Sequence, residues 1–352
     1  MADVAFRLAA PSRRLTSGAV AGALVLASAY LLPPLVGSTY LFEAILLPFL
    51  ALSLAGLGLN LLTGYAGQLS LGSAAFMAVG AYAAFNFDLR VPGLPFVGSL
   101  ILGGLSAAAV GLAFGLPSLR LRGFYLAVST LAAQFFVQWA LNKFDWFSNG
   151  SASGVVRAPD IVLAGHVIDG PVERYLFALT VVVAATLFAV RLANSQTGRN
   201  FIAVRDNETA ARIVGVPVLR TKLVAFAVSS FIIGVAGALW SFAYLRTIEP
   251  AGFNLDRSFQ ILFIVIIGGL ASIRGAFFGA ALIVVLPLAL SRLGQAAFGG
   301  AFDSGVLELS QRVLLGALII AFLIAEPKGL VALADRARAR ALRPFLKPPY
   351  GG

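Results

Sequence analysis

The chain has 352 residues, of which 59% are hydrophobic and only 12% carry a charge, about half the share that is usual in soluble domains. Such a surplus of apolar side chains excludes an ordinary soluble globule and indicates lipid as the main solvent. The single histidine, His166, and the lack of cysteine exclude thiol nucleophiles, disulfides and cysteine-based metal centres. We therefore predict no catalytic residue and no metal site.

Apolar runs long enough to cross a bilayer recur along the chain. They are apolar on all sides and lack the period of two that is typical of spanning strands, so they predict an all-α, polytopic transmembrane helical bundle. About ten spans are predicted, at residues 19–36, 41–62, 68–87, 94–116, 124–142, 175–192, 223–245, 259–272, 275–291 and 307–325. The predicted domains are an N-terminal segment (1–18), a membrane domain (19–325) and a basic tail (326–352).

Positive charge is divided unequally between the two faces that these spans define. An even number of spans places both termini on one face, which takes 18 of the 26 Lys and Arg residues and a net charge of +13, against −2 on the other face. Cytoplasmic loops carry such an excess, so we expect both termini to be cytoplasmic. The basic tail is then expected to lie near anionic membrane lipid. No nucleic-acid partner is predicted, because no basic cluster is interleaved with base-stacking aromatic residues.

The predicted spans contain few ionisable side chains. Glu43, Arg191, Glu308 and Arg312 all lie within about two turns of a span end, where a charge is inexpensive. An ion-driven carrier usually needs deeper carboxylates, so an ATP-independent carrier or channel is the less favoured alternative. A lipid-modifying enzyme is also disfavoured, because no buried pair of nucleophile and base is found. No lysine follows a glycine, so the chain lacks a phosphate-binding loop and no cofactor is predicted in it.

Two glycine-rich segments, 63–68 and 268–275, interrupt apolar runs and predict broken helices. Unwound backbone in a membrane is tolerated only where protein or a water-filled cavity surrounds it, and paired interruptions often mark a transport path. Uncharged polar groups at this depth suit a small neutral or zwitterionic solute, although close helix packing by small residues is an equal alternative. The candidate path residues are Asn60, Thr63, Gly64, Tyr65, Gly67, Gln68, Ser70, Ser73, Gly268 and Gly269.

Two loops complete the prediction, an outer loop at 143–174 and a cytoplasmic loop at 193–222. The cytoplasmic loop has the pattern of one amphipathic helix of about four turns. Ser195 or Thr197 can cap its start, Gly215 suits a left-handed end, and Pro217 prevents continuation. Such a helix either docks a partner or lies on its own bundle or at the lipid headgroups, and the pattern favours neither.

The cytoplasmic loop also carries a resemblance to a known family. Ala210-Ala211 followed by Gly215 resembles the EAA signature of ABC-importer permeases, with Thr209 in place of its Glu, and AVRDNETAARIVGV (203–216) is similar to LivM-type branched-chain amino acid permeases. Four further stretches resemble that family in order from about residue 41 to 330. They are GLGLNLLTGYAGQLSLGSAAFMAVGAYAA (56–84), LPSLRLRGFYLAVSTLA (116–132), SNGSASG (148–154) and IIGGLASIRGAFFGA (266–280).

The resemblance implies a permease subunit of an ABC importer in a bacterial inner membrane, forming the path for branched-chain or related amino acids. Urea or short amides are the alternative cargo within the family. The implied partners are a LivH-type permease subunit, two ABC ATPase subunits that bind and hydrolyse the ATP, and an extracytoplasmic solute-binding protein that contacts the outer loop; a homodimer is not excluded. The implied ATPase-coupling residues are Arg205, Asp206, Glu208, Ala210, Ala211 and Gly215.

Overall fold

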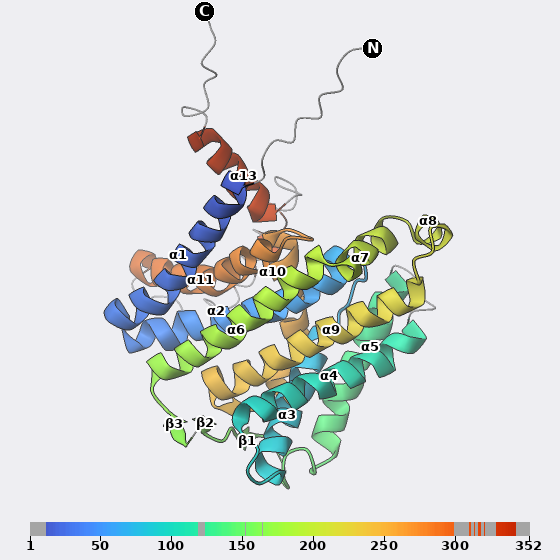
Figure 1. Ribbon diagram of the computed structural model, residues 1–352. Coiled ribbons are helices and arrows are strands. Elements are labelled where there is room, and N and C mark those ends of the chain that lie inside the picture. Colours follow the sequence, from blue (N-terminus) through green and yellow to red (C-terminus); the bar gives the residue numbers. More distant parts are fainter. Residues whose placement is uncertain are drawn as a thin grey trace, which may run out of the picture.

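The computed structural model describes residues 12–118, 124–151, 153–163, 165–298 and 329–342, with single positions between 310 and 320. Within these residues the chain is a helical bundle with four very short strands, which confirms the predicted all-α class (Figure 1). The helices are α1 (Ser12–Val36), η1 (Leu41–Leu46), α2 (Leu47–Asn60), η2 (Leu61–Tyr65), α3 (Ser73–Arg90), α4 (Phe96–Ser118), α5 (Phe124–Lys143), α6 (Pro171–Asn194), α7 (Gln196–Asp206), α8 (Glu208–Ile213), α9 (Val218–Leu239), η3 (Trp240–Leu245), η4 (Pro250–Phe253), α10 (Leu255–Gly268), α11 (Ile273–Phe298) and α13 (Gly329–Leu342). The strands are β1 (Val156–Arg157), β2 (Ile161–Leu163), β3 (His166–Ile168) and β4 (Thr247–Ile248).

The helices coincide with the predicted spans, each of the first nine of which falls on a described helix. The tenth, at 307–325, lies largely outside the described residues. Five described helices are both long and apolar enough to cross a membrane, by length and composition. They are Leu41–Tyr65, Phe96–Leu116, Pro171–Asn194, Val218–Leu245 and Ile273–Arg292. The tail contains a helix, α13, that was not predicted, and the domain limits stay predictions.

The centre of the bundle is α2, where every residue from Leu50 to Asn60 is buried, as are Leu61 and Leu62 at the start of η2. It packs against α6, α9, α10 and α11, while α3, α4 and α9 form a second tightly packed group. Glycines set the spacing of that group. A Cβ added at Gly80 would overlap the Gly234 carbonyl, and one added at Gly104 would lie 2.8 Å from the Phe231 ring. Small residues allow membrane helices to pack closely, and such packing stabilises the bundle because helix association in lipid has no hydrophobic driving force.

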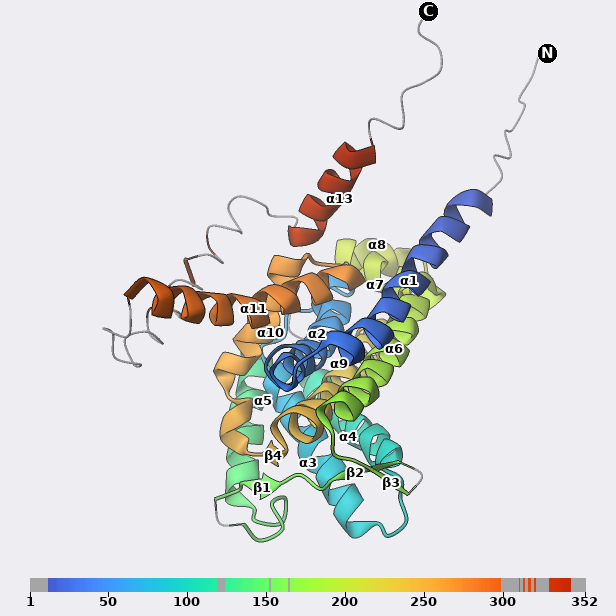
Figure 2. The ribbon, with the colours of Figure 1, turned by 90° about the vertical axis from the view of Figure 1, so that its left-hand side faces the viewer.

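The elements are sorted between two ends of the molecule. Figure 2 shows α7, α8 and α13 at one end and the four strands at the other, with α11 lying across the bundle. The strands make two small antiparallel pairs, β1 with β4 and β2 with β3. The loop predicted to be cytoplasmic and the loop predicted to be external therefore lie at opposite ends of the bundle.

Candidate functional site

The 193–222 loop forms two helices, so the prediction of a single four-turn helix is wrong. Ser195 caps α7 by accepting a hydrogen bond from the Gly198 N–H at 3.4 Å. The break falls at Asn207, whose extended backbone ends α7 and whose Oδ1 accepts the Ala210 N–H at 3.0 Å to start α8. Asparagine favours such a cap over a helix interior, because its side chain competes for backbone hydrogen bonds. Gly215 has the predicted left-handed conformation, with φ of 85°.

The side chains of α8 divide between the chain's own core and the exterior. Ala211 is 3% exposed and packs against Val204 and Val218, so its side chain lies in the chain's own core. Ile213 and Val214 are instead 81% and 75% exposed at the end of α8. This exposed pair was not predicted, although two adjacent β-branched residues before the terminating glycine can be recognised in the sequence.

The other predicted coupling residues have distinct positions. Glu208 forms an ion pair with Lys222 of α9, whose side chain is 9% exposed, so this pair ties α8 to the bundle. Ala210 and Gly215 are exposed, as is Asp206, which accepts from the Arg205 guanidinium at 2.9 Å. Lys222 was also missed, because its pairing with Glu208 crosses from the loop into the next helix.

Arg205 joins the coupling segment to the candidate path. Its Nη1 donates to the carbonyl oxygen of Gly64 at 2.9 Å, where η2 ends the α2 helix. A carbonyl bonded to a guanidinium is held more firmly than one bonded to a neutral donor. Two sets of residues that were predicted separately are therefore in direct contact.

The end of α2 is closed by its own hydrogen bonds. The Gln68 N–H donates to the Leu62 carbonyl at 3.0 Å, and the Thr63 hydroxyl donates to the Gln68 carbonyl at 3.1 Å. Gly67 turns the chain with φ of 68°, and a Cβ there would lie 2.6 Å from Cγ of Arg205. Tyr65, the last residue of η2, is half-buried. Only glycine fits position 67, because both the conformation and the space exclude a side chain.

Asn60 connects this segment to the second glycine-rich interruption. Its Nδ2 donates to the Ser272 carbonyl at 2.7 Å, and its Oδ1 accepts from the Ala271 N–H at 2.9 Å. Gly268 and Gly269 are buried and form the turn between α10 and α11, with φ of 118° at Gly269. The structure thus brings the two predicted interruptions together, and the second is a tight helix–helix turn.

Helix α3 begins inside the bundle, where its first N–H groups need partners. Oγ1 of Thr130 accepts from the Leu71 N–H at 2.9 Å, Oγ of Ser258 from that of Ala74 at 2.9 Å, and Oε1 of Gln134 from that of Ala75 at 2.6 Å. Ser70 and Ser73, two candidate path residues, are buried in this region. The three capping side chains come from α5 and α10. They were not predicted, because they are far in sequence from the start of α3.

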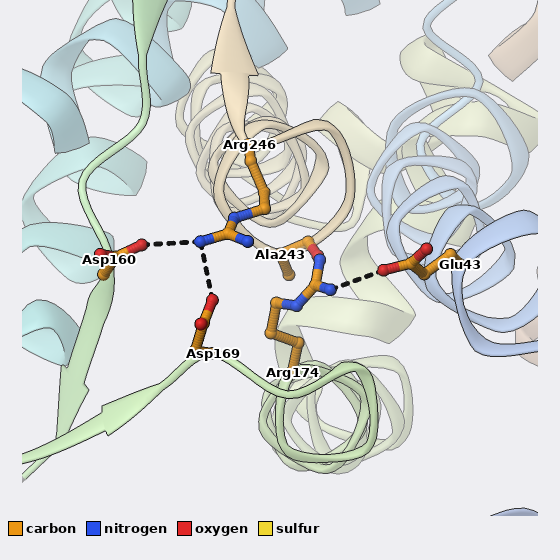
Figure 3. Close-up of polar contacts among 6 residues, drawn as sticks. All are labelled: Glu43, Asp160, Asp169, Arg174, Ala243 and Arg246. Carbon is orange, nitrogen blue, oxygen red and sulfur yellow. Dashed lines mark hydrogen bonds and ion pairs between the residues drawn. The ribbon is translucent and has the colours of Figure 1, made fainter. Parts of the chain in front are cut away.

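At the opposite end of the bundle, Arg246 and Arg174 form ion pairs between separate segments of the chain (Figure 3). Arg246 has φ of 57°, and its Nη2 lies 2.8 Å from both Asp160 and Asp169 in the outer loop. The hydrogen bond to Asp160 raises the pKa of Arg246. Arg174, with a side chain 6% exposed, donates to Glu43 at 2.7 Å and to the Ala243 carbonyl at 3.1 Å. The charge of Glu43, which was predicted to lie near a span end, is therefore balanced by its ion pair with Arg174.

The comparison with known families gives a match to the branched-chain amino acid transport system / permease component over residues 41–323. The chain belongs to this family. Its LivM members from Salmonella typhimurium and Escherichia coli are each 33% identical over 302 residues, covering 79% of this chain and 67% of theirs. A probable LivM permease of Methanocaldococcus jannaschii is 26% identical over 83% of this chain and 93% of its own. No solved structure matches significantly.

Family membership identifies the chain as the permease component of a transport system and confirms the resemblance in the sequence. The matched region contains the Arg205–Gly64 contact, the Asn60 bridge and both helices of the 193–222 loop. It also contains the arginine-fastened outer loop. The described contacts therefore lie within the part of the chain that matches the permease family.

Proposed function

We propose that this chain is a permease subunit of an ABC importer that carries branched-chain or related amino acids across the bacterial inner membrane. The names of the LivM relatives support this cargo. ATP is bound and hydrolysed by separate ATPase subunits, and the chain itself performs no catalysis. The observation that carries the proposal is the hydrogen bond from Arg205 to Gly64, because it connects the loop that would meet an ATPase to the segment that would line the path.

The proposed orientation places α7, α8 and both termini in the cytoplasm. The excess of basic residues on that side supports it. The ATPase subunits would then contact α8, where Ile213 and Val214 expose apolar surface that water does not favour. Thr209 and Ala210 are exposed beside them and complete the docking surface.

The opposite end of the bundle would receive the solute-binding protein. The outer loop is held to the bundle by the pairing of Val156 with Ile248 and by the ion pairs of Arg246. A docking surface needs such support, because a binding site keeps its geometry only when the segment that carries it is held rigidly. A LivH-type subunit is the proposed second permease, with a second copy of this chain as the alternative.

Reconstitution of the purified complex tests the proposal. The chain is tagged and extracted gently with its partners, the co-purifying proteins are identified by mass spectrometry, and the complex is placed in proteoliposomes with ATP and the binding protein. We expect uptake of radiolabelled leucine, isoleucine or valine that requires ATP, with urea and short amides failing to compete. Competition by urea would move the cargo to amides, and uptake by the chain alone would contradict an ABC importer.

A further inference from the structure

A polar cavity of about 330 Å³ lies between the coupling segment and the end of α2. Its walls are residues 66–68, Leu126 of α5, residues 204–209, and Lys222 of α9. Cavities that bind small molecules begin at about 300 Å³. The space therefore suits one small solute, and its position places that solute against both the coupling segment and the candidate path.

The charges that line the cavity balance one another. Arg205 pairs with Asp206 at 2.9 Å, and Lys222 pairs with Glu208. The wall thus has no net charge but presents both signs within a small space. Such a surface favours a ligand that also carries both charges and no net charge, and it offers little to a simple anion or cation.

Gln68 lines this cavity, and its buried amide is an unused hydrogen-bonding group. It is 2% exposed, and neither its amide nitrogen nor its amide oxygen has a hydrogen-bond partner within the described part of the chain. A buried polar group without a partner costs about 1–3 kcal/mol, and native proteins retain few of them. Turned toward the cavity, the amide would offer donors to a carboxylate and an acceptor to an ammonium group, which are the two charged groups of a free amino acid.

We propose that this cavity is an inner binding site for a free α-amino acid in its zwitterionic form, entered from the side of α7 and α8. The inference rests on the proposed function for its cargo and its sidedness. A bound amino acid contacts residues 66–68 and the coupling segment at once, and so holds them in one relative position. Cytoplasmic amino acid that accumulates therefore slows further import by restraining the segment that the ATPase must move.

Site-specific labelling tests this site, because the chain contains no cysteine. Thr209→Cys places a thiol on the exposed rim of the cavity, and Ile213→Cys places one on the same loop outside it. Both full-length chains are labelled with a maleimide in inside-out membrane vesicles washed free of peripheral ATPase subunits. We expect leucine at ten times its Kd to slow labelling of Thr209→Cys about ten-fold, and to leave Ile213→Cys unchanged.

Two analogues test the class of ligand. 4-Methylpentanoate keeps the carboxylate of leucine, and 3-methylbutylamine keeps its ammonium group, but neither carries both charges. We expect neither to protect Thr209→Cys at the concentration at which leucine does. Equal protection by either analogue, or protection of both cysteines by leucine, would overturn the proposal.

The role of Gln68 is tested by adding Gln68→Leu to Thr209→Cys. We expect protection by leucine to disappear, and to persist with Gln138→Leu, the same change on α5 outside the cavity. Leu126→Trp fills the cavity from α5 and should also remove protection by leucine. Because the two cavity variants differ in position and chemistry, misfolding of one of them would not explain the same loss in both. Persistent protection in both cavity variants would overturn the site. If the unaltered complex takes up leucine but leucine does not protect Thr209→Cys, this inference alone is overturned. If leucine protects Thr209→Cys but the complex takes up no leucine, the proposed function is contradicted.

Discussion

Arg205 and Gly64 are 141 residues apart in the chain, yet the Arg205 guanidinium donates to the Gly64 carbonyl at 2.9 Å. The same guanidinium also contacts Asp206, so its orientation is fixed from within α7. Movement of α7 therefore acts directly on the last turn of α2. The helix Leu41–Tyr65, which contains α2, is the most buried of the five described helices that are long enough to cross a membrane, so a displacement at its end moves packed neighbours and not only solvent.

The first prediction removes this contact. Arg205→Ala deletes a hydrogen bond to a charged group, which is worth about 1.5–3 kcal/mol, so we expect transport per ATP hydrolysed to fall by about ten-fold or more. Binding of the ATPase subunits should persist, since the apolar end of α8 is unchanged. The measurement is the ratio of leucine uptake to ATP hydrolysis in proteoliposomes.

Arg199→Ala is the matched control for this prediction. Arg199 lies on the same helix, and its hydrogen bonds within the described residues go to Asn194 and Gln196 and not to η2. We expect its ratio of uptake to hydrolysis to equal that of the unaltered complex. Equal loss in both variants would show that any arginine on α7 matters, and that the contact with Gly64 carries no special role.

The second prediction concerns Gly67. Gly67→Ala should lower uptake strongly, because an alanine in the left-handed region costs about 1–2 kcal/mol and its Cβ would also lie 2.6 Å from Cγ of Arg205. Gly93→Ala isolates the backbone cost, since Gly93 has φ of 80° and nothing within 4 Å of an added Cβ. We expect Gly93→Ala to lower only the thermal unfolding midpoint, slightly, and to retain uptake. Similar uptake in the two variants would contradict a role for the Gly67–Arg205 approach.

Features that depend on residues close together in the sequence could be predicted from it. Ser195 was predicted as one of two possible caps, with Thr197, and Gly215 as a helix end, because caps and left-handed glycines have local signatures. The break at Asn207 was missed because an asparagine is also tolerated within a helix. The bridge from Asn60 to Ser272 spans 212 residues, and no periodicity encodes such a pairing. Burial of Ala211 was likewise hidden, because it depends on where α9 packs.

The third prediction tests the Asn60 bridge. Asn60→Asp keeps an acceptor for the Ala271 N–H but loses the donor to the Ser272 carbonyl, and it places a charge at a position 1% exposed. We expect the thermal unfolding midpoint of the purified chain in detergent to fall by several degrees, consistent with a loss of about 2–4 kcal/mol. Asn142→Asp, on the exposed outer end of α5, is the control and should have little effect. An unchanged midpoint for Asn60→Asp would show that the turn at 269–272 is held by other contacts.

The fourth prediction separates docking from folding in α8. Ile213→Asp places a carboxylate on a side chain that is 81% exposed, so the fold should be retained while the apolar contact with an ATPase is lost. Ala211→Glu instead forces a charge into the contact with Val204 and Val218, where the alanine is 3% exposed. We expect Ile213→Asp to release the ATPase subunits during purification with an unchanged unfolding midpoint, and Ala211→Glu to lower that midpoint.

Leu219→Asp is the control for the docking surface, because Leu219 is also exposed, at 59%, but lies past Pro217 at the start of α9 and not in α8. Co-purification of the ATPases and their activity should be retained in this variant. If the subunits stay bound to Ile213→Asp as firmly as to Leu219→Asp, the exposed end of α8 is not where they dock. If Ala211→Glu releases them with an unchanged unfolding midpoint, Ala211 contacts the partner directly, and α8 must turn in the complex to expose it.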